Sequence, residues 1–482
     1  MLNLIKQKWD GNQSSIKTVP KSIDEITSDW CENVFKNESV ISNDTFVTSI
    51  NVKSLENEVT GLTDGGGLSG SALVRVIPKY SGNVNGKEPS SFICKLSLGT
   101  GYNLSIGWNF ILYCSAGGAY DEYMYRQEAN FLTNVLPEMK NSLYKYPEIY
   151  HCCTNEKSDR GFASAVILNR PTKLKSVILM QDMRGWRSSA VGIATTKEEA
   201  IMIFRNVAIL HSKFWGEKRK DIKMLFKPSR VDKDLRVWSH NKLQSIIAKS
   251  YFSTNTIKKN INKLLDSDWK TSPTTCMKAE NLVPEWFTVK ALQNGSRPVF
   301  GDELVQEMLG VMAARAPKYF DNKMKKFISK QSQTILHGDF HAGNHMFGID
   351  EHKGKIVALD FQFAGTGRVT TEFCYFFMQS LSPHSLEEIM EVAKCYHTEL
   401  IVNGVKDYTW EEFMDDIQAQ MIGSCLSFLS MCTMMKPEFL LKLGEGMSNG
   451  DGFKRMWENC LYGKHFILLT SIYLNDKDNY MI

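Results

Sequence analysis

The residues best suited to chemistry lie close together in the C-terminal half of the chain. The run HGDFHAGN occupies residues 337–344, and LDFQ follows at residues 359–362. Transfer of a phosphoryl group from ATP needs one carboxylate to orient the acceptor hydroxyl. It also needs an amide oxygen and a second carboxylate to hold Mg²⁺ on the phosphates. We therefore expect Asp339 to be the catalytic base and Asn344 and Asp360 to bind the metal.

The spacing of these residues also favours a shared site. The five-residue step from Asp339 to Asn344 fits one compact loop. A hairpin pattern with its turn at residues 350–354 would then return the chain so that Asp360 faces this loop. Asp and Asn also stabilise turns in ordinary loops, and the HGD triplet alone would occur by chance. The full pattern is far more restrictive, and it favours the catalytic interpretation.

The hydrophobic periodicity predicts the elements that carry this site. Residues 20–36 are expected to form a helix that begins at Ser22, and residues 46–95 to form strands separated by glycine-rich turns. Two short β-like runs follow, at residues 165–168 and 177–179. We expect helices at 120–139, 198–215, 243–265, 303–314, 385–402 and 410–435. This order of strands followed by helices indicates an α+β protein with a boundary after Asp182.

The bulk composition is that of a globular protein with more than one core. Its 482 residues exceed the length of one ordinary domain, which has about 100–200 residues. With 57 basic and 53 acidic residues the net charge is only +4, so we expect no nucleic-acid partner. We find no apolar run long enough for a membrane span and no signal peptide, which predicts a cytoplasmic location. The oligomeric state leaves no readable trace.

The eleven cysteines form no CxxC pair and show no zinc-like spacing with histidine. We expect them to be reduced thiols, most of them buried. The sequence therefore predicts no zinc site, and the expected metal is the Mg²⁺ that carboxylate and amide oxygens hold in phosphoryl transfer.

The run HGDFHAGNHMF followed by LDFQ resembles the aminoglycoside phosphotransferase and choline kinase superfamily, especially its ecdysteroid-kinase-like branch. The similarity extends over most of the chain. It implies a bilobal protein-kinase-like fold, with a small β-rich N-lobe and a large, mainly helical C-lobe. We accordingly expect an N-terminal extension at residues 1–19, a nucleotide-binding lobe at 20–182, and a lobe with the catalytic loop and substrate pocket at 183–482.

The resemblance also implies a set of residues that bind ATP. Gly65, Gly67 and Gly70 form a GxGxxG pattern between two strand-like runs, where backbone amides could approach the phosphates. Lys95 would contact the α- and β-phosphates, and Glu128 would be the ion partner that positions it. The competing partner is Glu122, six residues earlier. A glycine-rich hairpin turn is the alternative interpretation of the GxGxxG pattern, and its position before Lys95 favours the ATP role.

Further residues receive roles from the same resemblance. Main-chain groups near Gln181 and Asp182 would hydrogen-bond adenine. His337 would brace the catalytic loop, and His341 would contact phosphate or substrate. His211 is interpreted as a packing or hydrogen-bonding histidine.

One stretch and one substitution depart from the family pattern. The insertion at residues 101–118 is either a lid or an ordinary surface loop. Glu372 stands where many relatives have Asp, so its anchoring of the loop is open.

The function that this pattern predicts is phosphoryl transfer from ATP to a hydroxyl of a small molecule. Protein kinases favour Arg between His and Asp, whereas this chain has Gly338 and lacks their Ala-Pro-Glu ending. The acceptor would be a steroid-like, choline-like or aminoglycoside-like alcohol. The alternative is a catalytically inactive kinase fold that binds nucleotides or partners.

Overall fold

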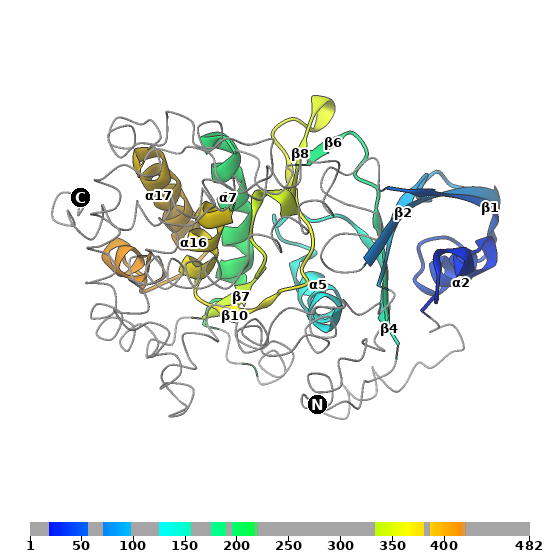
Figure 1. The fold of residues 1–482 in the computed structure, drawn as a ribbon, viewed down its shortest axis with the longest axis horizontal. Coiled ribbons are helices and arrows are strands. Elements are labelled where there is room, and N and C mark those ends of the chain that lie inside the picture. The colour runs from blue at the N-terminus through cyan, green and yellow to red at the C-terminus, as the bar shows by residue number, and fades with distance from the viewer. Residues whose placement is uncertain are drawn as a thin grey trace, which may run out of the picture. The chain divides into compact units, whose positions relative to one another are not determined.

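The computed structural model describes residues 19–55, 71–97, 125–155, 175–188, 195–216, 219, 333–379, 386–417 and 420. The chain divides into two compact units. Figure 1 shows the helices and strands of the described residues. Unit 1 comprises Met1–Glu138 and Tyr146–Gly185, and unit 2 comprises Met139–Lys145 and Trp186–Ile482. Several predictions fall outside the described residues: Gly65, Gly67, Gly70, Glu122, the insertion at 101–118, the β-like run at 165–168, and the helices at 243–265 and 303–314.

A five-stranded antiparallel sheet forms the centre of unit 1. Its order is β1-β2-β3-β5-β4. The strands are β1 (Thr45–Ser54), β2 (Ser71–Gly82), β3 (Phe92–Ser97), β4 (Ile149–Thr154) and β5 (Ser176–Gln181). In β3, Cys94 and Leu96 point into the core, so the alternation of a strand sends Lys95 to the opposite face. The strands predicted over residues 46–95 and 177–179 are therefore present.

The N-terminal helix differs from its prediction. Ser22 makes no side-chain cap and precedes only a short 3₁₀ turn, η1 (Ile23–Glu25). The α-helix α2 (Ser28–Asn37) begins after Thr27, whose hydroxyl accepts a hydrogen bond from the backbone N–H of Trp30 at 3.2 Å. Between them Ile26 is extended and only 4% exposed. Burial of Ile26 thus ends the first turn, and Thr27 supplies the cap that Ser22 was expected to form.

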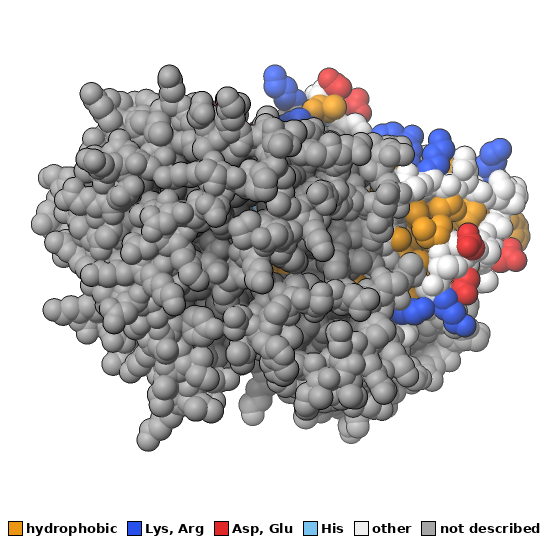
Figure 2. Space-filling model, viewed as in Figure 1, with side chains coloured by type: hydrophobic (Ala, Val, Ile, Leu, Met, Phe, Trp, Pro, Cys, Tyr) orange, Lys and Arg blue, Asp and Glu red, His pale blue; other side chains and the backbone are white. Residues whose placement is uncertain are grey.

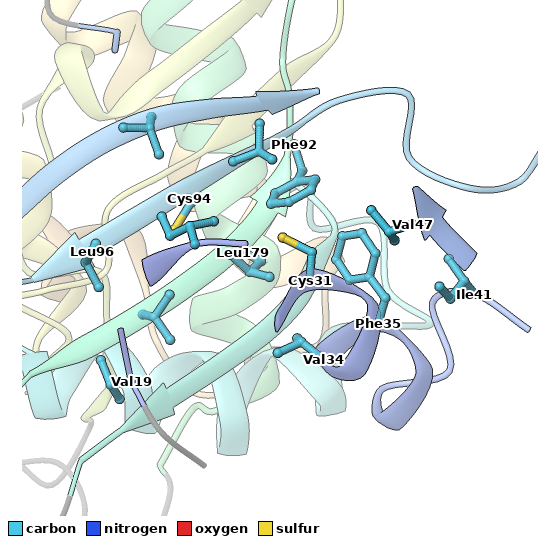
Figure 3. Packing of buried hydrophobic residues seen from close by; sticks show 14 residues of the cluster. Val19, Cys31, Val34, Phe35, Ile41, Val47, Phe92, Cys94, Leu96 and Leu179 are labelled. Carbon is cyan, nitrogen blue, oxygen red and sulfur yellow. The ribbon is translucent and has the colours of Figure 1, made fainter. Parts of the chain in front are cut away.

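Helix α2 covers one face of the sheet, as Figure 3 shows. Its buried residues Cys31, Val34 and Phe35 follow the three- and four-residue spacing of one helix face. The ring of Phe35 packs edge to face against Phe92 of β3, with 5.0 Å between the ring centres. These contacts bury the apolar face of the sheet and fix β3, the strand that carries Lys95.

The outer surface of unit 1 mixes apolar and charged side chains, and part of it is seen in Figure 2. Phe46 of β1 is 47% exposed. The ammonium group of Lys36 lies 4.2 Å from the centre of this ring, a cation–π geometry. Among the helices that the structure describes, none has the length and hydropathy of a membrane span.

Unit 2 combines helices with short strands. Its helices include α7 (Lys197–Lys213), α16 (Val369–Gln379) and α17 (Leu386–Val402). Its strands form two small sheets, β7 (Thr334–Leu336) with β10 (Gly365–Gly367), and β6 (Trp186–Ser188) with β8 (His345–Gly348) and β9 (Ile356–Ala358). The helices predicted at 198–215 and 385–402 are confirmed within two residues. Helices and sheets together confirm the α+β class.

An aromatic core holds these helices against the loop that contains Asp339. Phe204 of α7 lies 5.5 Å from Phe340, 5.1 Å from Phe376 of α16 and 5.0 Å from Tyr396 of α17, measured between ring centres. Such aromatic contacts add specific geometry to the burial of a large apolar area. The residue after Asp339 is therefore packed into the centre of unit 2.

Candidate functional site

The run HGDFHAGN forms one compact loop in unit 2. It follows β7 and ends in a 3₁₀ turn, η5 (Ala342–Asn344), directly before β8. The backbone N–H of His341 donates to the carbonyl of Asp339 at 3.0 Å, and that of Asn344 donates to the carbonyl of His341 at 3.0 Å. These local bonds fold the loop on itself, so Asp339 and Asn344 lie in the same turn.

The predicted hairpin brings Asp360 back to this loop. Strands β8 and β9 pair antiparallel, with His345 opposite Ala358, and the 3₁₀ turn η6 (Asp350–His352) lies within the connection. The pairing continues beyond the strands, because the N–H of Leu359 donates to the carbonyl of Asn344 at 2.8 Å. Asp360 is the next residue. The backbone of Asn344 is therefore hydrogen-bonded to the residue directly before Asp360, and this bond links the segments of the two expected metal ligands.

His337 fastens the other end of the loop. Its Nε2 lies 2.6 Å from the carbonyl oxygen of Leu359 and must donate the hydrogen, since a carbonyl oxygen only accepts. Burial lowers the pKa of His337, so its ring is neutral near pH 7 and Nδ1 carries no proton. His337 thus ties the loop to the strand end before Asp360.

The two carboxylate oxygens of Asp339 have different contacts. Its Oδ1 accepts a hydrogen bond from the hydroxyl of Tyr375 at 2.9 Å. Its Oδ2 lies 3.7 Å from Nε2 of His341, which is longer than a normal hydrogen bond. Burial by itself would raise the pKa of Asp339, but His341 and Tyr375 outweigh it and hold this pKa well below its usual range. Asp339 is therefore ionised near pH 7, with one oxygen fixed and one less occupied.

Asn344 and Asp360 offer donors that fit Mg²⁺. The Asn344 amide donates from Nδ2 to the carbonyl of Asp339 at 2.8 Å, which leaves Oδ1 as its oxygen for a cation. Asp360 adopts a φ of 59°, a left-handed conformation that non-glycine residues rarely take outside turns and functional sites. One amide oxygen and one carboxylate suit Mg²⁺, which commonly takes few protein ligands and completes its shell with phosphate and water.

A site for a softer metal is not formed by the described residues, where no three His, Cys, Asp or Glu side chains come together as ligands. A third histidine, which sequence reasoning did not single out, directly follows the loop as the first residue of β8. His345 donates from Nδ1 to the carbonyl of His341 at 3.0 Å, and burial lowers the pKa of His345 to about 3. Its ring is therefore neutral and serves the backbone of the loop.

Gly338 and Glu372 anchor the loop to the helices. Gly338 has a φ of +88°, and a Cβ there would lie 1.8 Å from the carbonyl oxygen of Phe363. Its N–H donates to Oε1 of Glu372 at 2.6 Å. Oε2 of Glu372 lies 2.7 Å from Nε2 of His211, whose Nδ1 is hydrogen-bonded to the hydroxyl of Tyr396. The open question about Glu372 is thereby answered: it contacts the loop directly.

Unit 1 contains the predicted lysine–glutamate pair. Nζ of Lys95 lies 2.8 Å from Oε1 and 2.9 Å from Oε2 of Glu128. Both residues are buried, at 7% and 4% exposure. Two charges buried this deeply hold each other in one geometry, because breaking the pair would leave an uncompensated charge. The competing partner, Glu122, lies outside the described residues.

Gln181 and Asp182 lie at the end of β5. The N–H of Gln181 donates to the carbonyl of Glu148 at 2.8 Å, and its side-chain Oε1 accepts from the N–H of Glu148 at 3.2 Å. The carboxylate of Asp182 accepts from Arg75, Ser91 and Arg184. Their side chains thus brace this segment, and the N–H of Gln181 is already used within the sheet.

Comparison with known proteins identifies a family. The chain matches the ecdysteroid kinase-like family over residues 70–406, more than half of its length. No curated protein matches it significantly.

Solved structures that resemble the chain at low identity include the following three. A candidate aminoglycoside phosphotransferase from Ralstonia eutropha JMP134 is 12% identical, with 91% of this chain and 97% of that one covered and a TM-score of 0.40. A microcompartment-associated aminopropanol kinase is 11% identical, with 87% and 95% covered and a TM-score of 0.39. A Plasmodium vivax ethanolamine kinase is 11% identical, with 97% and 96% covered and a TM-score of 0.35.

Likenesses this distant do not carry a function from those proteins to this one. The family match is different, because it spans the loop at 337–344, the hairpin and the Lys95–Glu128 pair within one continuous stretch. The chain therefore belongs to the ecdysteroid kinase-like family.

Proposed function

We propose that this protein transfers the γ-phosphate of ATP to a hydroxyl group of a small molecule. The observation that carries the proposal is the state of Asp339. Asp339 is partly buried and ionised, and its Oδ1 is held by Tyr375; within the described part of the chain, Oδ2 has no partner at normal hydrogen-bond distance. A carboxylate prepared in this way can orient a hydroxyl and accept its proton. Membership of a kinase-like family supports the same reaction.

The remaining residues of the loop would hold the metal. Oδ1 of Asn344 and the carboxylate of Asp360 are the oxygens that we assign to Mg²⁺. When bound, the ion would neutralise the negative charge of the phosphates. His337 and Glu372 do not touch a substrate in this proposal; they keep the loop in the shape that presents Asp339.

The nucleotide contacts of unit 1 complete the proposal. Lys95, held by Glu128, would bind the α- and β-phosphates of ATP. Main-chain groups after Gln181 would contact adenine, and the side chain of Asp182 would keep that segment in place. The glycine pattern at Gly65, Gly67 and Gly70 stays a prediction for the phosphates.

The acceptor is proposed as a class of molecule. The family name and the sequence pattern both favour an alcohol, and we propose a steroid-like, choline-like or aminoglycoside-like alcohol. No contact among the described residues distinguishes these three. A kinase fold without catalytic activity is the alternative, and the experiment below decides between them.

The test compares two aspartates of the same unit. The purified chain is incubated with Mg²⁺, γ-labelled ATP and a panel containing polyhydroxylated steroids, choline and aminoglycosides. Asp339→Asn should lose about 10²–10⁴-fold in turnover, the usual contribution of a positioned base. Asp350→Asn is the matched control, because Asp350 is exposed in the hairpin turn and also has a positive φ, of 47°. Its turnover should be unchanged.

Two outcomes would contradict the proposal. If Asp339→Asn keeps the wild-type rate, Asp339 is not the base. If the wild-type chain binds Mg·ATP, measured by titration calorimetry, but labels no member of the panel, the inactive alternative is favoured instead.

A further inference from the structure

Tyr375 contacts the proposed base directly, and sequence reasoning had given it no role. Its hydroxyl donates to Oδ1 of Asp339 at 2.9 Å across 36 residues of sequence. The direction of the bond is fixed, because an ionised carboxylate only accepts. A bond from a hydroxyl to a charged oxygen is among the stronger hydrogen bonds in proteins. Tyr375 therefore restricts the rotation of the Asp339 side chain.

Helix α16 makes Tyr375 a rigid support. Glu372 lies three residues earlier on this helix, close to the same face, and holds the N–H of Gly338 at 2.6 Å. One helix thus contacts the loop at two consecutive residues, at the backbone of Gly338 and at the side chain of Asp339. The same helix is packed into the aromatic core through Phe373 and Phe376. The position of the phenol is therefore set by the core of unit 2.

The two oxygens of Asp339 become distinguishable as a result. Oδ1 is occupied by Tyr375, whereas Oδ2 lies 3.7 Å from Nε2 of His341, beyond a normal hydrogen bond. A hydroxyl that approaches Asp339 would meet its less occupied oxygen, Oδ2.

We propose that Tyr375 is a positioning residue that pins Oδ1 of Asp339 so that Oδ2 receives the proton of the acceptor. This inference rests on the proposed function. In the step, the acceptor oxygen forms a bond to the γ-phosphorus and the bond from that phosphorus to the β–γ bridging oxygen breaks. ADP leaves with the electron pair of the broken bond, and the acceptor proton passes to Oδ2. Tyr375 keeps its own proton throughout.

The first test removes one oxygen atom. Tyr375→Phe keeps the aromatic ring on α16 but removes the hydroxyl that donates to Oδ1 of Asp339. Because Tyr375 acts on the base and not on nucleotide binding, kcat should fall about tenfold to a hundredfold while KM for Mg·ATP stays unchanged. Rates are measured with the alcohol of highest turnover in the panel above, and with water by following hydrolysis of Mg·ATP alone.

The matched control is Tyr408→Phe. Tyr408 also donates a phenol hydrogen bond to a buried carboxylate of unit 2, that of Asp416, at 3.0 Å. Its removal should lower the melting temperature as much as Tyr375→Phe does, or more, but leave kcat unchanged. A fall in kcat in both variants would point to a general structural effect and would overturn the inference.

The second test asks whether Tyr375 acts through Asp339. Adding Tyr375→Phe to Asp339→Asn should reduce kcat no further, because the base on which Tyr375 acts is already absent. Additive losses would overturn the inference even if the single variant folds poorly.

The outcomes also separate this inference from the function on which it rests. A wild-type chain without turnover rejects both. An active wild type with an equally active Tyr375→Phe variant rejects only the role of Tyr375.

Discussion

Two aspartates, one in each unit, show how differently the same side chain can be used. Asp182 at the end of β5 accepts hydrogen bonds from Arg75 at 2.8 Å, Ser91 at 2.7 Å and Arg184 at 3.1 Å. The carboxylate of Asp339 accepts one normal hydrogen bond from the residues that the structure describes, that of Tyr375. The pKa of both is lowered: burial would raise the pKa of Asp182, but Ser91 and Arg75 outweigh it. A lowered pKa therefore does not tell the two roles apart.

The difference lies in how many donors each carboxylate already holds. Asp182 is saturated by groups of its own unit, and it ties Arg75 of β2 to the end of β5. The carboxylate of Asp339 is ionised, but only its Oδ1 has a close hydrogen-bond donor among the described residues. A partly buried, ionised oxygen without a close donor has a free-energy cost, which a substrate hydroxyl would relieve. We infer that occupancy, more than ionisation, separates a structural aspartate from a catalytic one in this chain.

The largest expected effect concerns the turn before Asp339. Gly338→Ala would place Cβ 1.8 Å from the carbonyl oxygen of Phe363, at a φ of +88°. Because the loop must move to relieve this overlap, we expect unit 2 to lose about 3 kcal/mol of stability. Turnover should fall as well, since Asp339 moves with the loop. Thermal unfolding and the kinase assay measure the two effects.

Gly185→Ala is the control in the other unit. Gly185 has nearly the same φ, +84°, but no atom lies within 4 Å of a Cβ placed there. Only the backbone strain applies, so the cost should be about 1 kcal/mol without loss of turnover. Equal effects of the two substitutions would show that the contact with Phe363 does not hold the loop.

The next prediction concerns the saturated aspartate. Asp182→Asn removes the charge that Arg75 and Arg184 contact, and we expect unit 1 to lose about 2 kcal/mol. If adenine is bound by main-chain groups, KM for Mg·ATP should stay near the wild-type value in the protein that remains folded. Chemical denaturation and steady-state kinetics check the two parts. A large rise in KM without loss of stability would assign the carboxylate itself to nucleotide binding.

Local patterns in the sequence predicted the backbone of the site better than its contacts. The hairpin after Asn344 was predictable, because alternating apolar residues and a turn lie within one short segment. The cap of α2 was assigned to Ser22 instead of Thr27, because the choice depends on burial of Ile26 against a core that no local pattern describes.

Contacts between distant segments were the hardest to predict. Glu372 and His211 are 161 residues apart, and Tyr375 and Asp339 are 36 apart. No local spacing relates them, so only the packing of α7 and α16 reveals these partners. The pair of Lys95 and Glu128 was predicted from family resemblance, and spacing alone would not have chosen it. The roles of all these residues in catalysis stay predictions until the variants are measured.

The smallest expected effect concerns the pH dependence of stability at a hydrogen-bonded histidine, His151. Nδ1 of His151 lies 2.7 Å from Oε1 of Glu38. Burial by itself would lower the pKa of His151, but hydrogen bonds with Cys153 and Glu38 raise it to about 9. The folded chain therefore keeps a proton that the unfolded chain releases near pH 6.5. This contribution to stability is complete below about pH 6.5 and is lost as the pH rises toward 9. Over this pH range, the denaturation midpoint of the wild type should fall, and that of Glu38→Gln should fall less. Parallel profiles of midpoint against pH would show that Glu38 does not hold the proton on His151.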